Sequence, residues 1–177
     1  MLQSGEVTQT TYLCSPAPKR IFVTITTVSN GSFSGVFGAD GICQGRATAA
    51  GLSGTYLAWI GDQVTSAPAS RFAKSVTPYT LVDGTTVAGN WTGLTSGTLQ
   101  HAVNMTELGG AASGPVWTDV SGDGTFNVNI WQCNGWTAFT SGPYYGAVGD
   151  PTSTTASWTS NGFQSCGNAA HLYCVEQ

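Results

Sequence analysis

A stretch rich in oxygen-bearing side chains is the first candidate for chemistry in this sequence. Residues 117–125 read Trp-Thr-Asp-Val-Ser-Gly-Asp-Gly-Thr, which places Asp119, Ser121 and Asp123 at alternate positions. Carboxylate, hydroxyl and backbone carbonyl oxygens are the ligands that calcium prefers, so Asp119 and Asp123 are metal-ligand candidates. The stretch lacks the ligand spacing and the terminal Glu of a standard calcium loop, and an Asp-Gly turn explains it equally well.

Aromatic rings close to amide side chains form the second candidate. Such rings suit stacking on the apolar face of a sugar, while amides and carboxylates bond to its hydroxyl groups. The candidate ligand-binding residues are Trp117, Asp119, Asp123, Asn129, Trp131, Asn134, Trp136, Tyr144 and Tyr145. Burial in the core is the competing interpretation for each ring, because indole rings dominate burial in small β-rich domains. Trp59, Trp91 and Trp158 fall in strand-like patterns and are assigned to the core.

Catalysis has little support in the sequence. His101 and His171 have no adjacent nucleophile motif, and the Gly-x-Ser-x-Gly, His-Glu-x-x-His and Walker patterns are absent. A hydrolase could use a carboxylate pair such as Glu107 and Asp119, but nothing in the sequence brings these two together. We therefore expect no enzymatic activity.

Charge and hydropathy exclude two classes of partner. The chain has 177 residues, of which 8% are charged, and its net charge is -4. A protein with five Lys and Arg in total has no cationic stripe to displace counterions from phosphates, so we expect no nucleic-acid partner. No run of 18 apolar residues is present, so we expect no membrane span.

Cysteine usage indicates an oxidising compartment. With two histidines in the chain and no Cys-x-x-Cys pair, a zinc site is not expected. Two disulfides with one cysteine left over is the plain interpretation. Any of the five can stay free and the other four can pair in three ways, so fifteen arrangements are open. The five are Cys14, Cys43, Cys133, Cys166 and Cys174.

The elements that must position these residues follow from periodicity and turn signals. Alternation predicts a strand over 20–28, and apolar positions at three- and four-residue spacing predict a helix over 39–50. A shorter helix is predicted over 66–75, where Arg71 is expected to pair with a carboxylate such as Asp62. Further strands are predicted over 56–60, 79–82, 116–118, 135–139, 156–159 and 171–176.

Residues 1–18 are polar and end in Cys-Ser-Pro-Ala-Pro, which predicts a linker or stalk remnant before one domain at 19–177. The N-terminus has neither the basic start nor the apolar stretch of a signal peptide. We expect the chain to be a piece of a longer exported protein.

Several segments together resemble a known family. They are Ile-Phe-Val-Thr (21–24), Gly-Ala-Asp-Gly-Ile-Cys-Gln (38–44), Ala-Ala-Gly-Leu-Ser-Gly-Thr-Tyr-Leu-Ala-Trp-Ile (49–60), Ser-Arg-Phe (70–72), Tyr-Thr-Leu-Val-Asp-Gly-Thr (79–85), Cys-Asn-Gly-Trp (133–136) and Leu-Tyr-Cys-Val-Glu (172–176). The chain resembles bacterial endostatin-like, C-type lectin-like domains found at the ends of large surface proteins. The resemblance implies an α+β fold with two helices, short antiparallel strands, long loops and two disulfides.

The same resemblance implies a disulfide pairing. Cys43 would pair with Cys174, and Cys133 with Cys166. Cys14 would then be a free thiol, or it would form an interchain bridge, or its partner would lie further upstream in a longer protein. Calcium-dependent lectins carry Glu-Pro-Asn or Gln-Pro-Asp and then Trp-Asn-Asp before the third cysteine, whereas this chain has Asn-Ile-Trp-Gln at 129–132. A ligand would therefore be bound differently.

From the resemblance we expect an extracellular adhesion or recognition domain at the bacterial cell surface, at the tip of a larger surface or fibre protein. It would bind a glycan or another cell-surface ligand without catalysis. The alternative is a structural assembly cap, such as a trimerising homo-oligomer, with no small ligand of its own.

Overall fold

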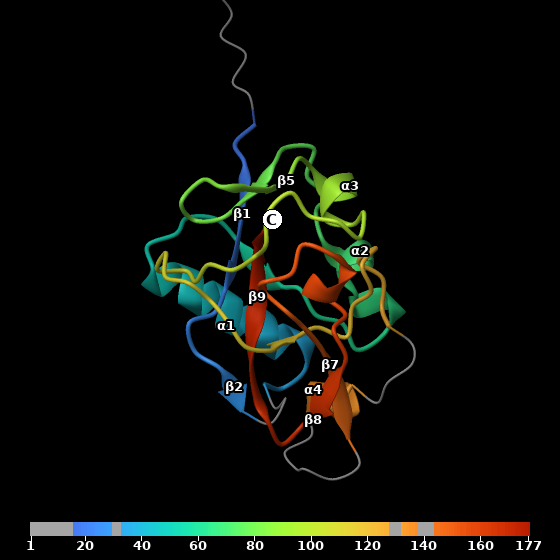
Figure 1. Ribbon diagram of the computed structural model, residues 1–177. Helices are drawn as coiled ribbons and strands as arrows, with labels where there is room; N and C mark the ends of the chain where they lie inside the picture. The colour runs from blue at the N-terminus through green and yellow to red at the C-terminus, as the bar shows by residue number, and fades with distance from the viewer. Residues whose placement is uncertain (1–15, 30–32, 128–131, 138–143) are drawn as a thin grey trace, which may run out of the picture.

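The computed structural model describes residues 16–29, 33–127, 132–137 and 144–177 (Figure 1). In these residues nine strands form one sheet with the order β5-β4-β1-β9-β6-β7-β8, and β2 and β3 pair with β9 outside that path. The strands are β1 (Lys19–Val23), β2 (Val28–Ser29), β3 (Tyr56–Ala58), β4 (Tyr79–Thr80), β5 (Thr86–Ala88), β6 (Val116–Trp117), β7 (Tyr145–Gly149), β8 (Phe163–Ser165) and β9 (Ala169–Glu176). The helices are α1 (Val36–Ala49), η1 (Val64–Ser66), α2 (Pro68–Arg71), α3 (Trp91–Leu94), α4 (Cys133–Trp136) and η2 (Ala156–Trp158).

The last strand of the chain, β9, is the centre of the sheet. It pairs antiparallel with β1 on one edge and with β3 on the other, so that Val175 lies opposite both Ile21 and Leu57. It also pairs parallel with β6, where Val116 lies opposite His171. The C-terminal residues therefore close the domain by joining strands from distant parts of the chain.

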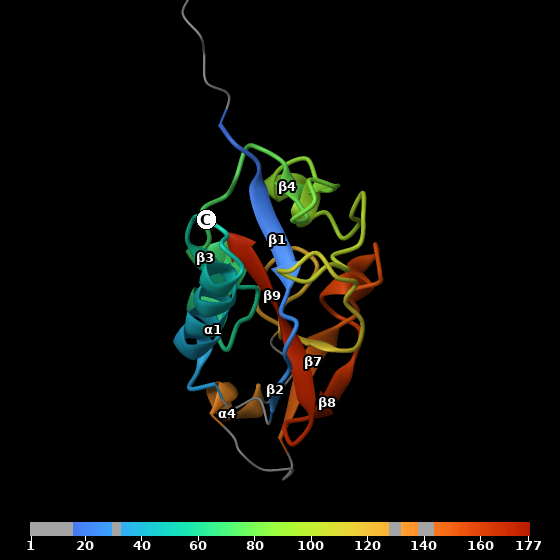
Figure 2. The same ribbon diagram turned by 90° about the vertical axis from the view of Figure 1, so that its left-hand side faces the viewer.

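Alternate side chains of β1 and β9 enter two separate cores. Phe22 and Cys174 pack on one face with the buried residues of α1. Ile21 and Tyr173 pack on the other face with Trp158. Figure 2 shows α1 beside one face of these strands and the loop-rich segments beside the other. Because successive side chains of a strand point to opposite faces, both faces of the central strands are buried.

Helix α1 lies close to the sheet because its buried stripe is made of small residues. Ala39, Cys43 and Ala47 are fully buried at four-residue spacing, as the predicted helix over 39–50 requires. The helix begins at Val36, three residues before the predicted start. The stripe brings the Cys43 sulfur to the central strand.

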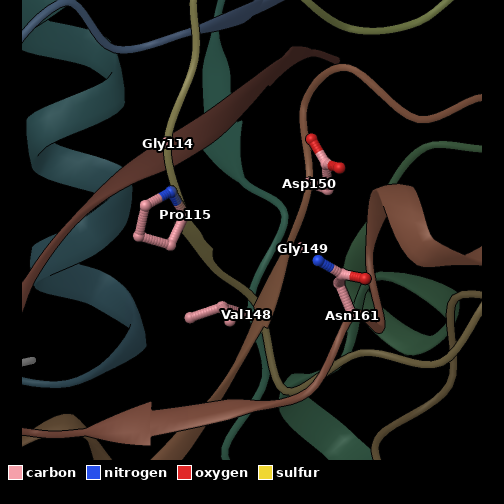
Figure 3. A pocket seen from close by; sticks show the side chains of 6 residues that line it. All are labelled: Gly114, Pro115, Val148, Gly149, Asp150 and Asn161. Atoms are coloured by element: carbon pink, nitrogen blue, oxygen red, sulfur yellow. The ribbon is translucent and has the colours of Figure 1, made fainter.

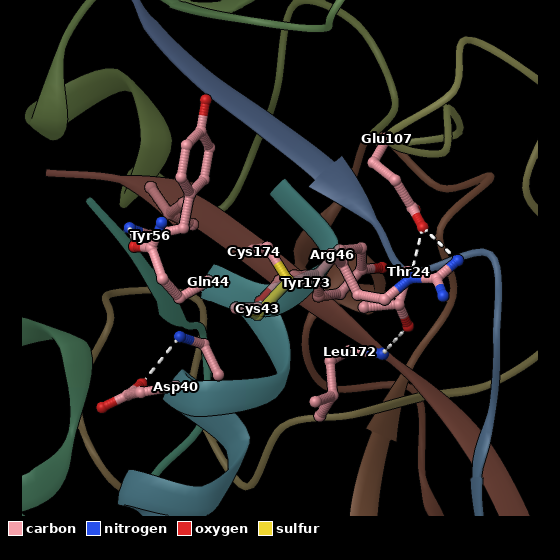
Figure 4. The surroundings of a disulfide bond; sticks show 12 residues. Thr24, Asp40, Cys43, Gln44, Arg46, Tyr56, Glu107, Leu172, Tyr173 and Cys174 are labelled. Carbon is pink, nitrogen blue, oxygen red and sulfur yellow. Dashed lines mark hydrogen bonds and ion pairs between the residues drawn. A yellow bond between two sulfur atoms is a disulfide. The ribbon is translucent and has the colours of Figure 1, made fainter. Parts of the chain in front are cut away.

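Two side chains of α1 also accept hydrogen bonds from backbone N–H groups at the outer edge of β3. Asp40 Oδ1 accepts a hydrogen bond from Ala58 N at 2.8 Å, and Gln44 Oε1 accepts one from Tyr56 N at 2.9 Å (Figure 4). Asp40 and Gln44 are four residues apart, so they lie on one side of the helix. Tyr56 and Ala58 are two residues apart, so their N–H groups point to the same edge of the strand. Each side chain therefore meets one N–H group. The helix therefore covers an edge that would otherwise expose unpaired donors.

Two disulfides fasten these elements. Cys43 in α1 is bonded to Cys174 in β9 (Figure 4), and Cys133 in α4 is bonded to Cys166, which follows β8. All four residues are fully buried. This is the pairing that the family resemblance implies. Cys14 lies outside the described residues.

Three element predictions are wrong. Residues 133–136 form α4, where a strand was expected from residue 135, and 138–139 lie outside the described residues. Asn134 and Gly135 have left-handed backbone angles there, between the disulfide-bonded Cys133 and the buried Trp136. Residues 156–158 form η2, because the Thr155 side chain caps a tight turn. The predicted helix over 66–75 ends at Arg71, since the next residue is extended.

The result is a mixed α+β fold with two disulfides, and four α-helices lie in the described part of the chain rather than the two expected. Three of the four are single turns of four residues, which are too short to give a periodic signal in the sequence. Among the described residues no helix is long and apolar enough to cross a membrane.

Candidate functional site

Two of the tryptophans predicted to face a ligand belong to the core. Trp117 and Trp136 are 0% exposed, and their ring centroids lie 5.6 Å apart at an interplanar angle of 64°. Trp136 Nε1 donates to the carbonyl of Gly61 at 2.8 Å. Neither ring offers a face to solvent, so these two residues are corrected from ligand contacts to core residues.

Asp119 is buried as well. Its Oδ1 accepts a hydrogen bond from Ala147 N at 2.5 Å, and its Oδ2 has no partner among the described residues. Burial raises the pKa of the Asp119 carboxyl well above its ordinary value, against the opposing effect of that hydrogen bond. The backbone of Asp119 has a φ of 49°, in the left-handed region. A carboxyl group in this position cannot meet a ligand or metal ion from solvent.

Asp123 belongs to a turn. Its Oδ1 accepts hydrogen bonds from Thr125 N at 3.0 Å and from Thr125 Oγ1 at 2.6 Å, and these bonds lower the pKa of its carboxyl. Ser121 N donates to the Thr125 carbonyl at 2.8 Å, which closes the turn. In the ranges that the structure describes, no three His, Cys, Asp or Glu residues lie together as metal ligands. Residues 121–125 thus have the geometry of the Asp-Gly turn rather than that of a calcium loop.

The two carboxylates of the hydrolase hypothesis are each engaged by other groups of the fold. Glu107 is 4% exposed, and its Oε1 lies 2.5 Å from Arg46 Nη2 (Figure 4). Its Oε2 accepts a hydrogen bond from Ile25 N at 2.8 Å. Both oxygens of Glu107 therefore fasten α1 and the segment after β1 to the 106–110 turn, and Asp119 is held by Ala147 elsewhere.

The remaining predicted residues differ in exposure. Asn129 and Trp131 lie outside the described residues. Asn134 is exposed, and its side chain donates to Thr137 Oγ1 at 3.3 Å. Tyr144 is partly buried and packs against the core cluster that contains α1. Tyr145, by contrast, is 49% exposed at the start of β7.

Tyr145 has an aromatic neighbour that the sequence analysis missed. In the β7–β8 pair Tyr145 lies opposite Ser165, and Ala147 lies opposite Phe163. Since opposite residues and residues two apart share a face, Tyr145 and Phe163 are diagonal neighbours on one face. Phe163 is 58% exposed, so both rings meet solvent. We name these two residues the edge-hairpin pair, because β8 ends the sheet order.

A glycine decides which face of β7 turns outward. A Cβ on Gly146 would lie 3.0 Å from atoms of Trp117 and Trp136 and 3.1 Å from Cys133 Sγ. The strand can approach the tryptophans this closely only because residue 146 has no side chain. Because Gly146 lies on the face of β7 that packs against the two tryptophans, the preceding residue Tyr145 points to the opposite face. The sequence signal for Phe163 was weak. Strand β8 has only three residues, directly after Asn161-Gly162, and three residues are too few to show an alternating pattern.

A shallow cavity of about 240 Å³ lies at the other end of β7. Pro115 and Val148 form one side, and the side chains of Asp150 and Asn161 point in from the other (Figure 3). Asp150 Oδ1 already accepts hydrogen bonds from Thr152 N and Thr152 Oγ1 at 2.9 and 2.7 Å. The cavity has no aromatic wall, so the edge-hairpin pair is the stronger candidate for sugar stacking.

No protein-family model and no curated protein sequence matches this chain.

Proposed function

We propose that this chain is an extracellular recognition domain that binds a glycan through the edge-hairpin pair, without catalysing a reaction. One observation carries the proposal: Tyr145 and Phe163 expose their rings on the same face of the terminal hairpin. Two exposed aromatic rings on one face form an apolar patch, and the C–H faces of sugar rings are suited to stack on such rings.

A hydroxyl group lies beside the two rings. Ser165 is opposite Tyr145 on the same face, and Ser165 Oγ accepts a hydrogen bond from Gly167 N at 3.3 Å. A hydroxyl that accepts one hydrogen bond still has its proton to donate. The face thus combines two stacking surfaces with one polar group that can orient a sugar hydroxyl.

The wider assignment rests on the family resemblance and on the disulfides. Two buried disulfides are compatible with an oxidising environment outside the cytoplasm. A C-type lectin-like, endostatin-like domain at the tip of a bacterial surface or fibre protein fits these features and the net charge of -4. We include that family, location and host protein in the proposal.

A glycan array followed by calorimetry on the best ligand tests the function. Tyr145→Ala and Phe163→Ala should each weaken binding at least tenfold, because each removes one stacking surface. Leu108→Ala is the control, since Leu108 is a large apolar side chain that is 65% exposed and is not part of the edge-hairpin pair. Absence of any glycan ligand, or a ligand whose affinity neither variant changes, would contradict the proposal.

The edge position of β8 supports a second candidate, the assembly cap. A strand at the end of a sheet exposes unpaired backbone groups that a second copy can pair with, and Phe163 lies on that strand. Light scattering of the wild type and of Phe163→Lys separates the two functions. An oligomer that Phe163→Lys dissociates, together with an empty glycan array, would favour the cap.

A further inference from the structure

A second cavity lies between the start of α1 and the turn that follows β3. Its volume is about 300 Å³, and it is more enclosed than the cavity beside β7. Gly35 and Phe37 line it from the start of α1, and Asp62, Gln63, Ser66 and Arg71 line it from the opposite side. None of these residues is part of the edge-hairpin pair.

The walls of this cavity are fixed by hydrogen bonds. Ser66 Oγ accepts from Asp62 N at 2.9 Å and from Gln63 N at 3.0 Å, which closes the turn. On the other wall, Gly35 N donates to the carbonyl of Trp136 at 3.3 Å, and Trp136 Nε1 donates to the Gly61 carbonyl. The cavity is therefore formed before a ligand arrives, which lowers the entropy cost of binding.

Asp62 is the carboxylate at this cavity, and it forms no salt bridge among the described residues, although the charge of Arg71 lies near enough to act on it. Arg71 is occupied, because its Nη1 lies 2.9 and 2.8 Å from the two oxygens of Asp40 and its Nε donates to the Ser66 carbonyl. Asp62 Oδ1 accepts from Ser66 Oγ at 2.5 Å, and within the described ranges no side chain donates to Asp62 Oδ2. The start of α1 contributes a positive partial charge of about one half that falls off within one turn. The full charge of Asp62 exceeds it, so the cavity is negative.

An aromatic ring stands at the same cavity. Phe37 lines it and is 87% exposed, the largest exposed fraction among the exposed large hydrophobic residues of the described chain. Aromatic faces attract cations, and they cover the apolar stem of a long cationic side chain. A carboxylate with an aromatic ring matches an ammonium group on an alkyl stem.

We propose that this cavity is a second binding site, which takes the primary ammonium group of a lysine side chain from a partner polypeptide. The ammonium group would pair with Asp62 Oδ2, and the methylene stem would lie against Phe37. Arg71 also lines the cavity, but its guanidinium donates its short hydrogen bonds to Asp40 and not to Asp62. The site is separate from the proposed glycan surface and does not depend on it.

An NMR titration of the ¹⁵N-labelled chain with Nα-acetyl-lysine N-methylamide tests the site. We expect saturable shifts of the amide signals of Gly35, Phe37, Gln63 and Ser66. The norleucine analogue has the same stem without the charge and should bind at least tenfold more weakly. An absence of saturable shifts with the lysine probe, or equal binding of the norleucine probe, would overturn the proposal.

Variants complete the test. Asp62→Asn keeps an oxygen to accept the Ser66 hydrogen bond and should weaken binding of the lysine probe at least tenfold; Phe37→Ala, at an exposed position, should weaken it severalfold. Phe163→Ala should leave it unchanged, whatever its effect on glycans. Unchanged affinity in both Asp62→Asn and Phe37→Ala would refute the site. Glucosamine provides a further arm, because tighter binding of this amino sugar than of the lysine probe would overturn the assignment to lysine.

Discussion

The guanidinium of Arg71 lies 2.8 and 2.9 Å from the two carboxylate oxygens of Asp40, and the two side chains are only 15% and 13% exposed. The same guanidinium also donates to the carbonyl of Ala58, and Asp40 accepts from Ala58 N. One ion pair thus joins α1, β3 and α2. Arg71 was expected to pair with a carboxylate such as Asp62; the carboxylate is that of Asp40, and Asp62 lines the adjoining cavity.

Breaking this ion pair should be costly. Asp40→Asn leaves a buried guanidinium without its counter-charge, and we expect it to lower the free energy of unfolding by about 3 kcal/mol. Asp83→Asn is the control, because Asp83 is exposed and its amide replacement can still accept from Thr85 N. Urea unfolding followed by tryptophan fluorescence measures both. A loss below about 1 kcal/mol for Asp40→Asn would contradict the role of the pair.

The two disulfides should differ in their contribution to stability. The Cys43–Cys174 bridge spans 131 residues and the Cys133–Cys166 bridge spans 33. In the chain-entropy model, removing the bridge that closes the longer loop lowers the free energy of unfolding by about 5 kcal/mol. Removing the bridge that closes the shorter loop lowers it by about 4 kcal/mol. Denaturant unfolding of the Cys43→Ala/Cys174→Ala and Cys133→Ala/Cys166→Ala double variants gives the comparison. A greater loss from opening the shorter loop would show that contacts around α4 outweigh loop entropy.

Asp119 should make stability fall as the pH rises. Burial raises the pKa of its carboxyl in the folded state, so the folded chain keeps this proton at pH values where the unfolded chain, with an ordinary pKa of about 3.9, has lost it. The contribution of this proton to the free energy of unfolding is fully present below the pKa that Asp119 has in the unfolded chain. It is lost as the pH rises through the pKa that Asp119 has in the folded chain. Asp119→Asn, which resembles the protonated acid, should remove this dependence.

Thermal unfolding of both proteins between pH 4 and pH 7 checks this prediction. The melting temperature of Asp119→Asn minus that of the wild type should increase with pH. Asp123→Asn, followed down to pH 2, is the comparison, because the hydrogen bonds from Thr125 lower the pKa of Asp123 and give the opposite slope below about pH 4. A difference for Asp119→Asn that stays constant over the range would show that this carboxyl does not titrate with folding.

Two glycines of α1 should respond in opposite directions to the same substitution. A Cβ on Gly38 would lie 1.4 Å from the backbone oxygen of Phe33, so Gly38→Ala should cost about 3 kcal/mol of unfolding free energy. A Cβ on Gly45 meets no atom within 4 Å, so Gly45→Ala should stabilise the helix by about 1 kcal/mol. Circular dichroism melts of both variants suffice. Equal effects would mean that α1 does not pack against Phe33 as described.

Much of the central sheet was predictable from the sequence, and so was Tyr145 of the edge-hairpin pair, whereas the burial of the neighbouring tryptophans was not. The strand over 171–176 agrees with β9 because it is a continuous apolar run, and the helix over 39–50 agrees with α1 because its small apolar residues recur at three- and four-residue spacing. The tryptophans near Cys133 carry no such period. Nothing local distinguishes a ring that packs in the core from one that meets solvent, so the burial of Trp117 and Trp136 was not predicted, nor was the exposure of Phe163.

The sequence by itself determined the composition class, the long helix and the C-terminal strand, and the expectation of paired cysteines, because these depend on composition and on neighbours along the chain. Only the tertiary structure decided that Asp119 is buried, that Arg71 pairs with Asp40, and that Tyr145 shares a face with Phe163. Each of these follows from contacts between residues separated by 18 or more positions. Burial and partner choice are properties of the packed sheet, so local periodicity could not supply them.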